Sequence, residues 1–405
     1  MLSWVNRFSV FCFLDNQHYQ RGEHRYEFLL AAGVLKVYDT GSLNDLDNLL
    51  QNKQWCFGHL SYDLKNSIHG FNIDKENRQG FPLFNFFVPL HVFELKEDKL
   101  TIHTEDPDKL YAEIEAEEVY PDEISYNIHF QQRISKEEYI AKIKSLQKHI
   151  LAGDCYEINF CLEFFSENTL INPLAVFQKL SAVSPNPFSC FYRCGDSYLI
   201  CASPERFLLK QGNIILSQPM KGTIKRDLEN IDRDKVLFEE LKSSAKDKSE
   251  NVMVVDMVRN DLTKICTESS VNVDELFGVY TYPHVHQMIS TISGELKPGI
   301  SFTEIIKATF PMGSMTGAPK HRVMELIDEY EPAARGIFSG SVGYINPEGD
   351  FDLNVVIRSI MYNASTQYLS YGVGSGITFY SDPQKEWEEC LLKGEAIKKV
   401  LSREL

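Results

Sequence analysis

The sequence predicts an α+β fold with mostly antiparallel sheets, and three observations support this prediction. Runs rich in aromatic and aliphatic residues, such as "WCFGHLSYDL" and "FNFFVPLHVFEL", recur along the chain and are typical of strands. These runs come in long blocks, and only a few long helical patterns separate the blocks. Hydrophobic residues make up 43% of the 405 residues, which is enough apolar material for two domains or one large intertwined one.

The first region, residues 1–125, is expected to be rich in strands. Its apolar run "FSVFCFL" is interpreted as a strand rather than a signal peptide, because "DNQHY" follows it without a cleavage site of small residues. The acidic segment 104–125, "TEDPDKLYAEIEAEEVYPDEIS", marks the predicted boundary with a second region, residues 126–405.

The second region opens with the clearest helix of the sequence. Ser135 and Glu138 form a capping-box pattern at its start, and Gly153 ends it. The run "CYEINFCLEFF" follows as a strand, and "SYLICASPERFLLKQGNIILS" is expected to form a hairpin. The run "SENVMVVDMVRNDL" is mostly apolar, which predicts a buried helix.

The last third of the chain alternates between helices and strands. "PMGSMTGAPKHRVMELIDEYEP" is predicted to be a loop that opens a helix, with Pro319 in the first turn. "GSVGYI" and "DLNVVIRSIMY" are expected to be two strands, and "LSYGVGSGITF" a strand broken by glycines. The final helix is expected to run from about Pro383 to Ser402.

Charge and cysteine usage exclude several classes of protein. The net charge of −16 argues against nucleic acid and acidic membranes as partners. No run approaches the roughly 20 apolar residues that a membrane span needs. The nine cysteines are odd in number and include no CxxC pair, which argues against a disulfide framework or a zinc site and favours a cytoplasmic location.

Two predicted helices each carry a pair of carboxylates three residues apart, a spacing that places each pair on one face. The pairs are Asp247 with Glu250 and Glu386 with Glu389. Together they offer the oxygen ligands that Mg²⁺ prefers. Two solvated acidic faces explain the same spacing, and from the spacing alone this alternative is favoured.

Two glycine loops and one arginine point to anion binding. "GVGSGI" offers bare backbone N–H groups, and "GSMTGAPK" offers a helix N-terminus with Ser314 and Thr316, although simple turn chemistry is favoured for both on pattern alone. Arg358, expected inside a strand, pairs with a protein carboxylate or grips an anionic ligand, with comparable odds. His284 and His286 form an HxH pair, for which a hydrogen-bonded, partly buried pair is favoured over a metal site.

Taken together, these segments resemble the chorismate-utilising enzymes. That family includes component I of anthranilate synthase, component I of aminodeoxychorismate synthase, and isochorismate and salicylate synthases. The resemblance is strongest from about residue 130 onward and is carried by "GDCYEIN", "ASPERFL", "PMKGT", "ENVMVVDMVRNDL", "PMGSMTGAPKHRVMELIDEYEP", "GSVGY", "VVIRS", "GVGSGI" and "SDPQKEWEECLLKGEAI". It implies two large antiparallel sheets flanked by helices, with chorismate and Mg²⁺ bound in a cleft between the sheets.

The resemblance also implies roles for individual residues. For the paired carboxylates, it favours a Mg²⁺ site over two solvated acidic faces. The residues that match Mg²⁺ ligands are Glu250 and Glu389, with Asp247 and Glu386 beside them. Residues that match the groups holding the substrate carboxylates are Arg358, the amides of Gly374, Ser375 and Gly376, and Lys393, while Ser314 and Thr316 lie in the neighbouring loop motif.

Lys221 in "PMKGT" distinguishes members of this family. Anthranilate and isochorismate synthases typically carry alanine at this position, whereas aminodeoxychorismate synthases carry lysine. A lysine amine can attack C2 of chorismate and expel the 4-hydroxyl, after which ammonia attacks C4 and expels the lysine. The amine must be partly neutral to attack, which burial near Mg²⁺ is expected to favour. Thr223 is expected to support this site.

Two positions depart from the family pattern. Gln287 stands where the family usually has a histidine that assists departure of the 4-hydroxyl. Glutamine can donate a hydrogen bond but is a poor general acid, so either another acid serves or a hydrogen bond alone assists the departure. His286 cannot replace that histidine, because neighbouring residues of a strand point to opposite faces. Glu157 stands where aminating members have glutamine and water-adding members have a lysine base. The missing lysine argues against isochorismate synthesis, and the glutamate is able to hold ammonium or, conceivably, to activate water.

The resemblance therefore implies amination of chorismate to 4-amino-4-deoxychorismate for 4-aminobenzoate and folate synthesis, with Mg²⁺ as cofactor. A chain of 405 residues is expected to lack a fused glutamine amidotransferase and a fused lyase, so separate subunits are expected to supply ammonia and release pyruvate. The alternatives are component I of an anthranilate synthase, or a non-catalytic subunit that binds chorismate.

Overall fold

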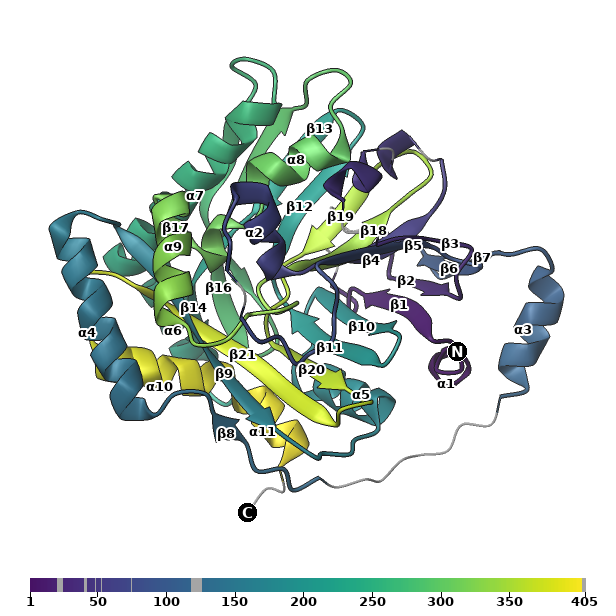
Figure 1. Ribbon diagram of the computed structural model, residues 1–405, viewed down its shortest axis with the longest axis horizontal. Helices are drawn as coiled ribbons and strands as arrows, with labels where there is room; N and C mark the ends of the chain where they lie inside the picture. Colours follow the sequence, from purple (N-terminus) through teal and green to yellow (C-terminus); the bar gives the residue numbers. More distant parts are fainter. Residues whose placement is uncertain are drawn as a thin grey trace.

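A computed structural model describes residues 1–19, 25–39, 42–47, 49–51, 53–73, 75–117 and 126–402 (Figure 1). Its strands form two large sheets, one of eleven strands and one of ten, and neighbouring strands pair antiparallel, as in the first pair, β1 with β10. Helices flank the sheets. The prediction of an α+β fold with antiparallel sheets is therefore confirmed. The predicted boundary at 104–125 lies partly outside the described residues.

The first sheet has eleven strands from both halves of the chain. Their order is β17 (Gly317–Ala318), β9 (Glu157–Ser166), β21 (Tyr368–Ile377), β20 (Ser359–Asn363), β11 (Ser197–Ser203), β10 (Phe188–Cys194), β1 (Val10–Asp15), β2 (Phe28–Ala32), β6 (His91–Lys96) and β7 (Lys99–His103), and β8 (Gln131–Gln132) pairs with β9. The run "FSVFCFL", predicted to be a strand, lies largely in β1.

The second sheet also combines strands from both regions. Their order is β14 (Met220–Lys225), β16 (Val285–Glu295), β13 (Ile214–Gln218), β12 (Arg206–Gln211), β19 (Phe351–Asn354), β18 (Ser341–Ile345), β4 (Cys56–Leu60), β5 (Phe84–Val88) and β3 (Lys36–Tyr38), and β15 (Asn272–Thr281) pairs with β16. Residues 1–125 thus supply strands to both sheets.

Helices pack on both sheets and define two apolar cores. One core fills the space between the sheets and includes residues of α7 (Ala245–Ile265) and α8 (Phe302–Thr309). The other lies under α4 (Lys136–Ala152), α5 (Pro173–Val183), α9 (Lys320–Tyr330), α10 (Pro383–Lys393) and α11 (Glu395–Leu401) on the first sheet. The remaining helices are α1 (Leu2–Val5), α2 (Lys65–His69), α3 (Pro107–Glu115) and α6 (Ile231–Ser243), with short 3₁₀ turns η1 (Leu43–Leu46), η2 (Leu49–Gln51), η3 (Tyr62–Leu64) and η4 (Gly313–Met315).

Helix α4 forms for the reasons that its sequence indicates. Ser135 accepts a hydrogen bond from the Glu138 N–H while the Glu138 carboxylate accepts from the Ser135 N–H, which completes the capping box. Gly153 ends the helix with φ of 86°, a left-handed conformation that glycine adopts without strain. The helix packs against α10 beside β9 and β21 (Figure 1).

Three predictions about element ends were wrong. Strand β21 is not broken by its glycines but continues to Ile377, because the glycines leave room for neighbours that pack against one face. The last helix divides into α10 and α11 at Gly394. Pro319 precedes α9 as its N-cap residue instead of lying in the first turn.

Two crossovers between the sheets were also not predicted. The expected hairpin forms β11 in the first sheet and then β12 and β13 in the second, so only β12 and β13 are a hairpin. The expected strand "DLNVVIRSIMY" divides into β19 in the second sheet and β20 in the first. Both segments stay largely buried through the change of sheet, so their apolar pattern continues without a break. The crossovers lie side by side, since the Val355 N–H donates to the Glu205 carbonyl at 3.0 Å.

A buried ion pair completes one edge of the first sheet. The Arg335 guanidinium donates to the Asn159 carbonyl at 2.8 Å, and the Glu331 carboxylate accepts from the Cys161 N–H at 2.8 Å. The two side chains bond each other at 2.6 Å and are almost fully buried. They occupy the place of a neighbouring strand along this part of β9, which carries Glu157 at its start.

Replacing Arg335 with leucine is expected to lower the free energy of unfolding by about 3–5 kcal/mol, because Glu331 is left as an uncompensated buried charge. Urea denaturation followed by circular dichroism measures the change. Arg322→Leu is the matched control, since Arg322 pairs with Glu325 on the surface, and its cost is expected to stay below about 1 kcal/mol. Equal costs for the two variants would contradict this account of the β9 edge.

No helix in the described part of the chain is long and apolar enough to cross a membrane. All nine cysteines lie within the described residues and are free thiols, eight of them buried.

Candidate functional site

Lys221 lies in a β-bulge of β14 that turns its side chain toward the first sheet. Met220 pairs with Ile289 and Thr223 pairs with Gln287, so two residues, Lys221 and Gly222, face the single residue between these partners on β16. Bulges of this kind re-aim side chains beside active sites. Gly222 has φ of 93°, and a Cβ there would lie 2.9 Å from the Cβ of Asp247, so backbone conformation and space both require glycine.

The amine of Lys221 joins the two sheets. It donates a hydrogen bond to the Glu157 carboxylate at the start of β9, and it lies 3.9 Å from the Glu250 carboxylate on α7. Glu157 is 3% exposed, and its second carboxylate oxygen is buried without a hydrogen-bond partner among the described residues. The ion pair therefore holds the amine against a carboxylate that has a second, unpartnered oxygen within the described residues.

The carboxylates around Lys221 favour its charged form. Burial by itself lowers the pKa of Lys221, but the carboxylates of Glu157, Glu250 and Glu389 outweigh burial and raise it above the ordinary lysine value. Lys221 is therefore protonated at neutral pH when no cation neutralises these carboxylates. The expectation of a partly neutral amine concerns burial near bound Mg²⁺ and stays a prediction.

Glu205 is a functional candidate that the sequence reasoning missed. It lies in the crossover between β11 and β12, is 4% exposed, and is close to Ser314, the Met220 N–H and the charge of Lys221. Burial raises the pKa of Glu205 to about 7 although these neighbours favour the charged form. A carboxyl with this pKa is suited to proton transfer at neutral pH. The signal in the sequence was the proline of "ASPERFL", which interrupts the presumed hairpin.

Arg358 does not lie inside a strand, as was predicted, but in the second crossover with φ of 53°. This left-handed conformation is strained for arginine and typical of functional positions. In the described chain its guanidinium makes no ion pair or side-chain hydrogen bond. Burial lowers the pKa of Arg358, and only the charge of Glu389 partly opposes this shift. Of the two predicted alternatives, pairing with a protein carboxylate is therefore absent from the described residues.

The glycines of β21 line an open edge beside Arg358. Strand β20 pairs with β21 only as far as Tyr371, so the edge beyond it is free. Gly374 and Gly376 lie opposite Cys161 and Asn159, whose N–H groups point away from β21, so both glycine N–H groups point to the open edge. The alternating Ser375 N–H points into the sheet, and its hydroxyl lies 3.1 Å from the Tyr139 hydroxyl. Only two of the three predicted amides therefore face the edge.

Gly376→Ala is expected to preserve the fold but lower kcat by about tenfold or more, because small misplacements of reacting groups are costly. A Cβ at this position would overlap the Lys221 amine and the nearest Glu157 oxygen, which are the flexible ends of side chains and can move apart. Ser375→Ala is the matched control on the opposite face of the strand. Thermal unfolding and steady-state kinetics separate the two effects. A Gly376→Ala variant with normal kcat would contradict this placement of the amine.

The four predicted metal ligands gather around the ends of α7 and α10. Burial lowers the pKa of Lys246, but the charges of Glu250, Glu386, Glu389 and Asp247 raise it overall, so all four carboxylates act on this part of the molecule. Within the described residues, no three His, Cys, Asp or Glu side chains are close enough together to hold a metal ion as they stand. Carboxylate oxygens are the donors that a hard divalent ion prefers, so this set of residues fits such an ion. In the structure, lysine ammonium groups lie beside these carboxylates instead.

Lys393 completes this group of charges. Its amine donates to the Gly374 carbonyl and to the Glu389 carboxylate, each at 2.7 Å. It therefore connects the predicted metal ligands on α10 with the open edge of β21.

Gln287 and Thr223 face each other across β14 and β16. Gln287 is 3% exposed, and its side-chain oxygen has no hydrogen-bond partner in the described part of the protein. His286 points to the other face, where it lies 3.0 Å from Asp234 and 3.0 Å from Thr281. His286 and Gln287 therefore point to opposite faces of β16, as predicted. The expected hydrogen-bonded, partly buried pair is wrong for His284, which is exposed and precedes β16, whereas His286 is buried and hydrogen-bonded.

The loop before α9 contributes less to the site than was expected. Ser314 lies beside Glu205 in a small pocket that Met312 also lines. The hydroxyl of Thr316 instead donates to the Met312 carbonyl at 3.1 Å and is fully buried, so it is not free for a substrate. The loop's lysine, Lys320, pairs with Asp261 and thereby fixes α9 to α7.

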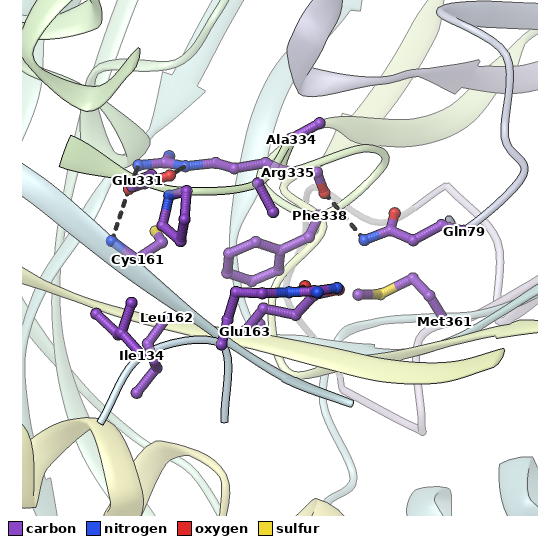
Figure 2. A pocket seen from close by; sticks show the side chains of 14 residues that line it. Gln79, Ile134, Cys161, Leu162, Glu163, Glu331, Ala334, Arg335, Phe338 and Met361 are labelled. Atoms are coloured by element: carbon purple, nitrogen blue, oxygen red, sulfur yellow. Dashed lines mark hydrogen bonds and ion pairs between the residues drawn. The ribbon is translucent and has the colours of Figure 1, made fainter. Parts of the chain in front are cut away.

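A separate pocket lies over β9, and Figure 2 shows it lined by Glu331, Arg335, Phe338 and Met361. None of the predicted site residues lines it. Gln79 closes one side through a hydrogen bond to the Arg335 carbonyl. The Glu331 and Arg335 side chains of this pocket already bond the backbone of β9. The candidate functional site is therefore placed at Lys221 instead.

Comparison with known proteins places this site in context. Residues 14–399 match the family described as chorismate binding enzyme. The chain is 30% identical over 363 residues to "Aminodeoxychorismate synthase component 1" of Bacillus subtilis, covering 85% of this chain and 76% of that protein. It is 41% identical over 270 residues to "Probable aminodeoxychorismate synthase, chloroplastic" of Oryza sativa subsp. japonica, covering 66% of this chain but 30% of that longer protein.

Solved structures agree with the fold. Anthranilate synthase component I from Streptococcus pneumoniae superposes with a TM-score of 0.80 at 25% identity, covering 96% of this chain and 95% of that one. The menaquinone-specific isochorismate synthase of Escherichia coli superposes with a TM-score of 0.79 at 17% identity, covering 99% and 91%, respectively. The two-sheet architecture expected from the sequence is the architecture of these proteins.

Proposed function

Because this chain belongs to the family of chorismate binding enzymes, we propose that it aminates chorismate with ammonia to give 4-amino-4-deoxychorismate. The observation that carries the proposal is the amine of Lys221, which a bulge turns toward Glu157 and which lies close to the buried carboxyl of Glu205. Relatives named aminodeoxychorismate synthase support the same reaction.

The first displacement uses Lys221 as the nucleophile. Its amine passes a proton to Glu157 and attacks C2 of chorismate, the ring double bonds shift, and the bond from C4 to the hydroxyl breaks. Glu205 gives its proton to the departing hydroxyl, which leaves as water. Glu205 thereby supplies the general acid that Gln287 is unable to supply. The product of this step is the substrate ring joined to Lys221.

The second displacement releases the lysine. Ammonia attacks C4, the double bonds shift back, and the bond between C2 and the Lys221 nitrogen breaks. Glu157 returns its proton to the amine, and Glu205 takes a proton from the incoming nitrogen. Both carboxyls are then in their starting states, and the net change is chorismate and ammonia to 4-amino-4-deoxychorismate and water.

The remaining groups bind and orient the substrate. Arg358 carries an unpaired guanidinium at the edge where the Gly374 and Gly376 N–H groups are free, and these groups are matched to a carboxylate. Glu250 and Glu389, with Asp247 and Glu386 beside them, would hold Mg²⁺. When bound there, Mg²⁺ would supply positive charge at the ring carboxylate and draw electrons toward it.

Ammonia is proposed to come from a separate glutamine amidotransferase subunit, in line with the "component 1" in the name of the Bacillus subtilis relative. The product is a precursor of 4-aminobenzoate and folate. A further enzyme must then eliminate pyruvate from the product, because no group in the site is assigned to that step.

The test is the identity of the product. The protein is incubated with chorismate, MgCl₂ and ammonium sulfate. The products are separated by chromatography, and their masses are measured by mass spectrometry. The proposal requires 4-amino-4-deoxychorismate. Anthranilate as the main product would instead assign the chain to the anthranilate synthases. Binding of chorismate without turnover would identify a non-catalytic subunit.

A further inference from the structure

Three lysines neutralise the carboxylates that are assigned to Mg²⁺. Lys221 lies 3.9 Å from one oxygen of Glu250, Lys246 lies 3.8 Å from the other, and Lys393 lies 2.7 Å from Glu389. Lys221 and Lys393 already have roles in the proposed reaction. Lys246 has none, and nothing in its immediate surroundings other than this carboxylate group accounts for its position.

Lys246 differs from the other two lysines in its freedom to move. It lies in the first turn of α7, directly before Asp247, and its side chain is 63% exposed. Lys221 is 14% exposed and is fixed by Glu157, while Lys393 is fixed by the Gly374 carbonyl. Only Lys246 can withdraw into solvent without breaking a contact inside the site.

Glu250 is the proposed ligand that Lys246 contacts. The Lys246 amine lies 3.8 Å from one Glu250 oxygen, and the Lys221 amine lies 3.9 Å from the other, so two lysines neutralise this one carboxylate. A divalent ion bound to Glu250 would meet the charge of Lys246 at close range and be repelled by it.

We infer that Lys246 is a built-in counter-cation, which neutralises the Glu250 carboxylate in the absence of a divalent ion and is displaced when that ion binds. This inference rests on the metal site of the proposed function. Lys246 and the ion are then mutually exclusive near Glu250, so the lysine weakens divalent-ion affinity and stabilises the metal-free protein.

Binding of Mn²⁺ to the protein alone tests the competition. Free Mn²⁺ is measured by electron paramagnetic resonance during a titration at constant ionic strength, without chorismate or ammonia. Lys246→Gln is expected to bind Mn²⁺ about tenfold more tightly, because a unit charge about 5 Å from a divalent ion repels it even in a solvated site. Lys246→Arg keeps the charge and is expected to bind like the unmodified protein.

Lys248→Gln is the matched control for net charge. Lys248 lies two residues further along α7, and its amine lies over the Phe277 ring at 5.7 Å. This variant is expected to change Mn²⁺ affinity by less than about twofold, since its charge is directed away from the carboxylates. Equal changes in the two glutamine variants would overturn the inference, as would weaker Mn²⁺ binding by Lys246→Gln.

Thermal unfolding gives a second readout that a purely structural role would not reproduce. Lys246→Gln is expected to unfold at a lower temperature than the unmodified protein without divalent ions, and at the same temperature or above in saturating MgCl₂. An equal loss of stability in both conditions would contradict displacement. Mn²⁺ binding without formation of 4-amino-4-deoxychorismate would reject the proposed function but leave this inference standing. An unmodified protein that binds no Mn²⁺ would reject the metal site and this inference together.

Discussion

Replacing Lys221 with alanine is expected to reduce formation of 4-amino-4-deoxychorismate by about 10³-fold or more, because loss of a covalent nucleophile removes both displacement steps. Ammonia can then attack only at C2 directly, so any remaining product is expected to carry its nitrogen at C2. Product analysis by mass spectrometry and chromatography measures both the rate and the position of the nitrogen.

Lys225→Ala provides the control for this substitution. Lys225 lies on the same strand, is exposed, and pairs through its backbone with Val285. Its replacement is expected to leave the rate unchanged within about twofold, as is usual for surface positions. A Lys221→Ala variant that forms the 4-amino product at the normal rate would exclude the covalent mechanism.

Glu205→Gln is expected to slow the first displacement by about 10²–10³-fold, because glutamine cannot protonate the departing hydroxyl. The measurement is a single turnover of chorismate in the absence of ammonia, so that the titration of ammonia does not enter. Glu239→Gln on the exposed surface of α6 is the control and is expected to have no effect.

The pH dependence of that single turnover gives a sharper test. Burial raises the pKa of Glu205 to about 7, so the carboxyl is protonated below this pH and loses its proton above it. The acid form is the active one in the first displacement, and the rate is therefore expected to fall as pH rises through about 7. The rate of the Glu205→Gln variant is expected not to fall in this pH range. The same fall in rate in both proteins would mean that another group is the acid.

Local signals in the sequence predicted the frame of the site. The capping box of Ser135 and Glu138 fixed the start of α4, and helical spacing put each carboxylate pair of α7 and α10 on one face, although only the family resemblance favoured a metal site over two solvated faces. The alternating faces of β16 separated His286 from Gln287 as expected. These features depend on residues that are close together along the chain, so a pattern reveals them.

The parts that the sequence did not reveal depend on pairing between distant segments. The bulge at Lys221 exists because of the register of β14 against β16, and Arg358 and Glu205 lie where the chain passes between sheets. Their flanking segments stay apolar across these changes, so the hydrophobic pattern does not mark the sites, and only the proline of "ASPERFL" signals one of them. The charge of Lys221 is likewise set by carboxylates from three other segments, which no local pattern around Lys221 reveals.

The central claim is that Lys221 forms a covalent bond to the substrate ring, and peptide mass spectrometry tests it most directly. The protein is mixed with chorismate and MgCl₂ without ammonia, quenched in acid and digested. The account predicts that the peptide containing Lys221 gains the mass of chorismate less one water, and that the Lys221→Ala protein gains nothing. An unmodified Lys221 in a sample that makes 4-amino-4-deoxychorismate as soon as ammonia is added would contradict the account.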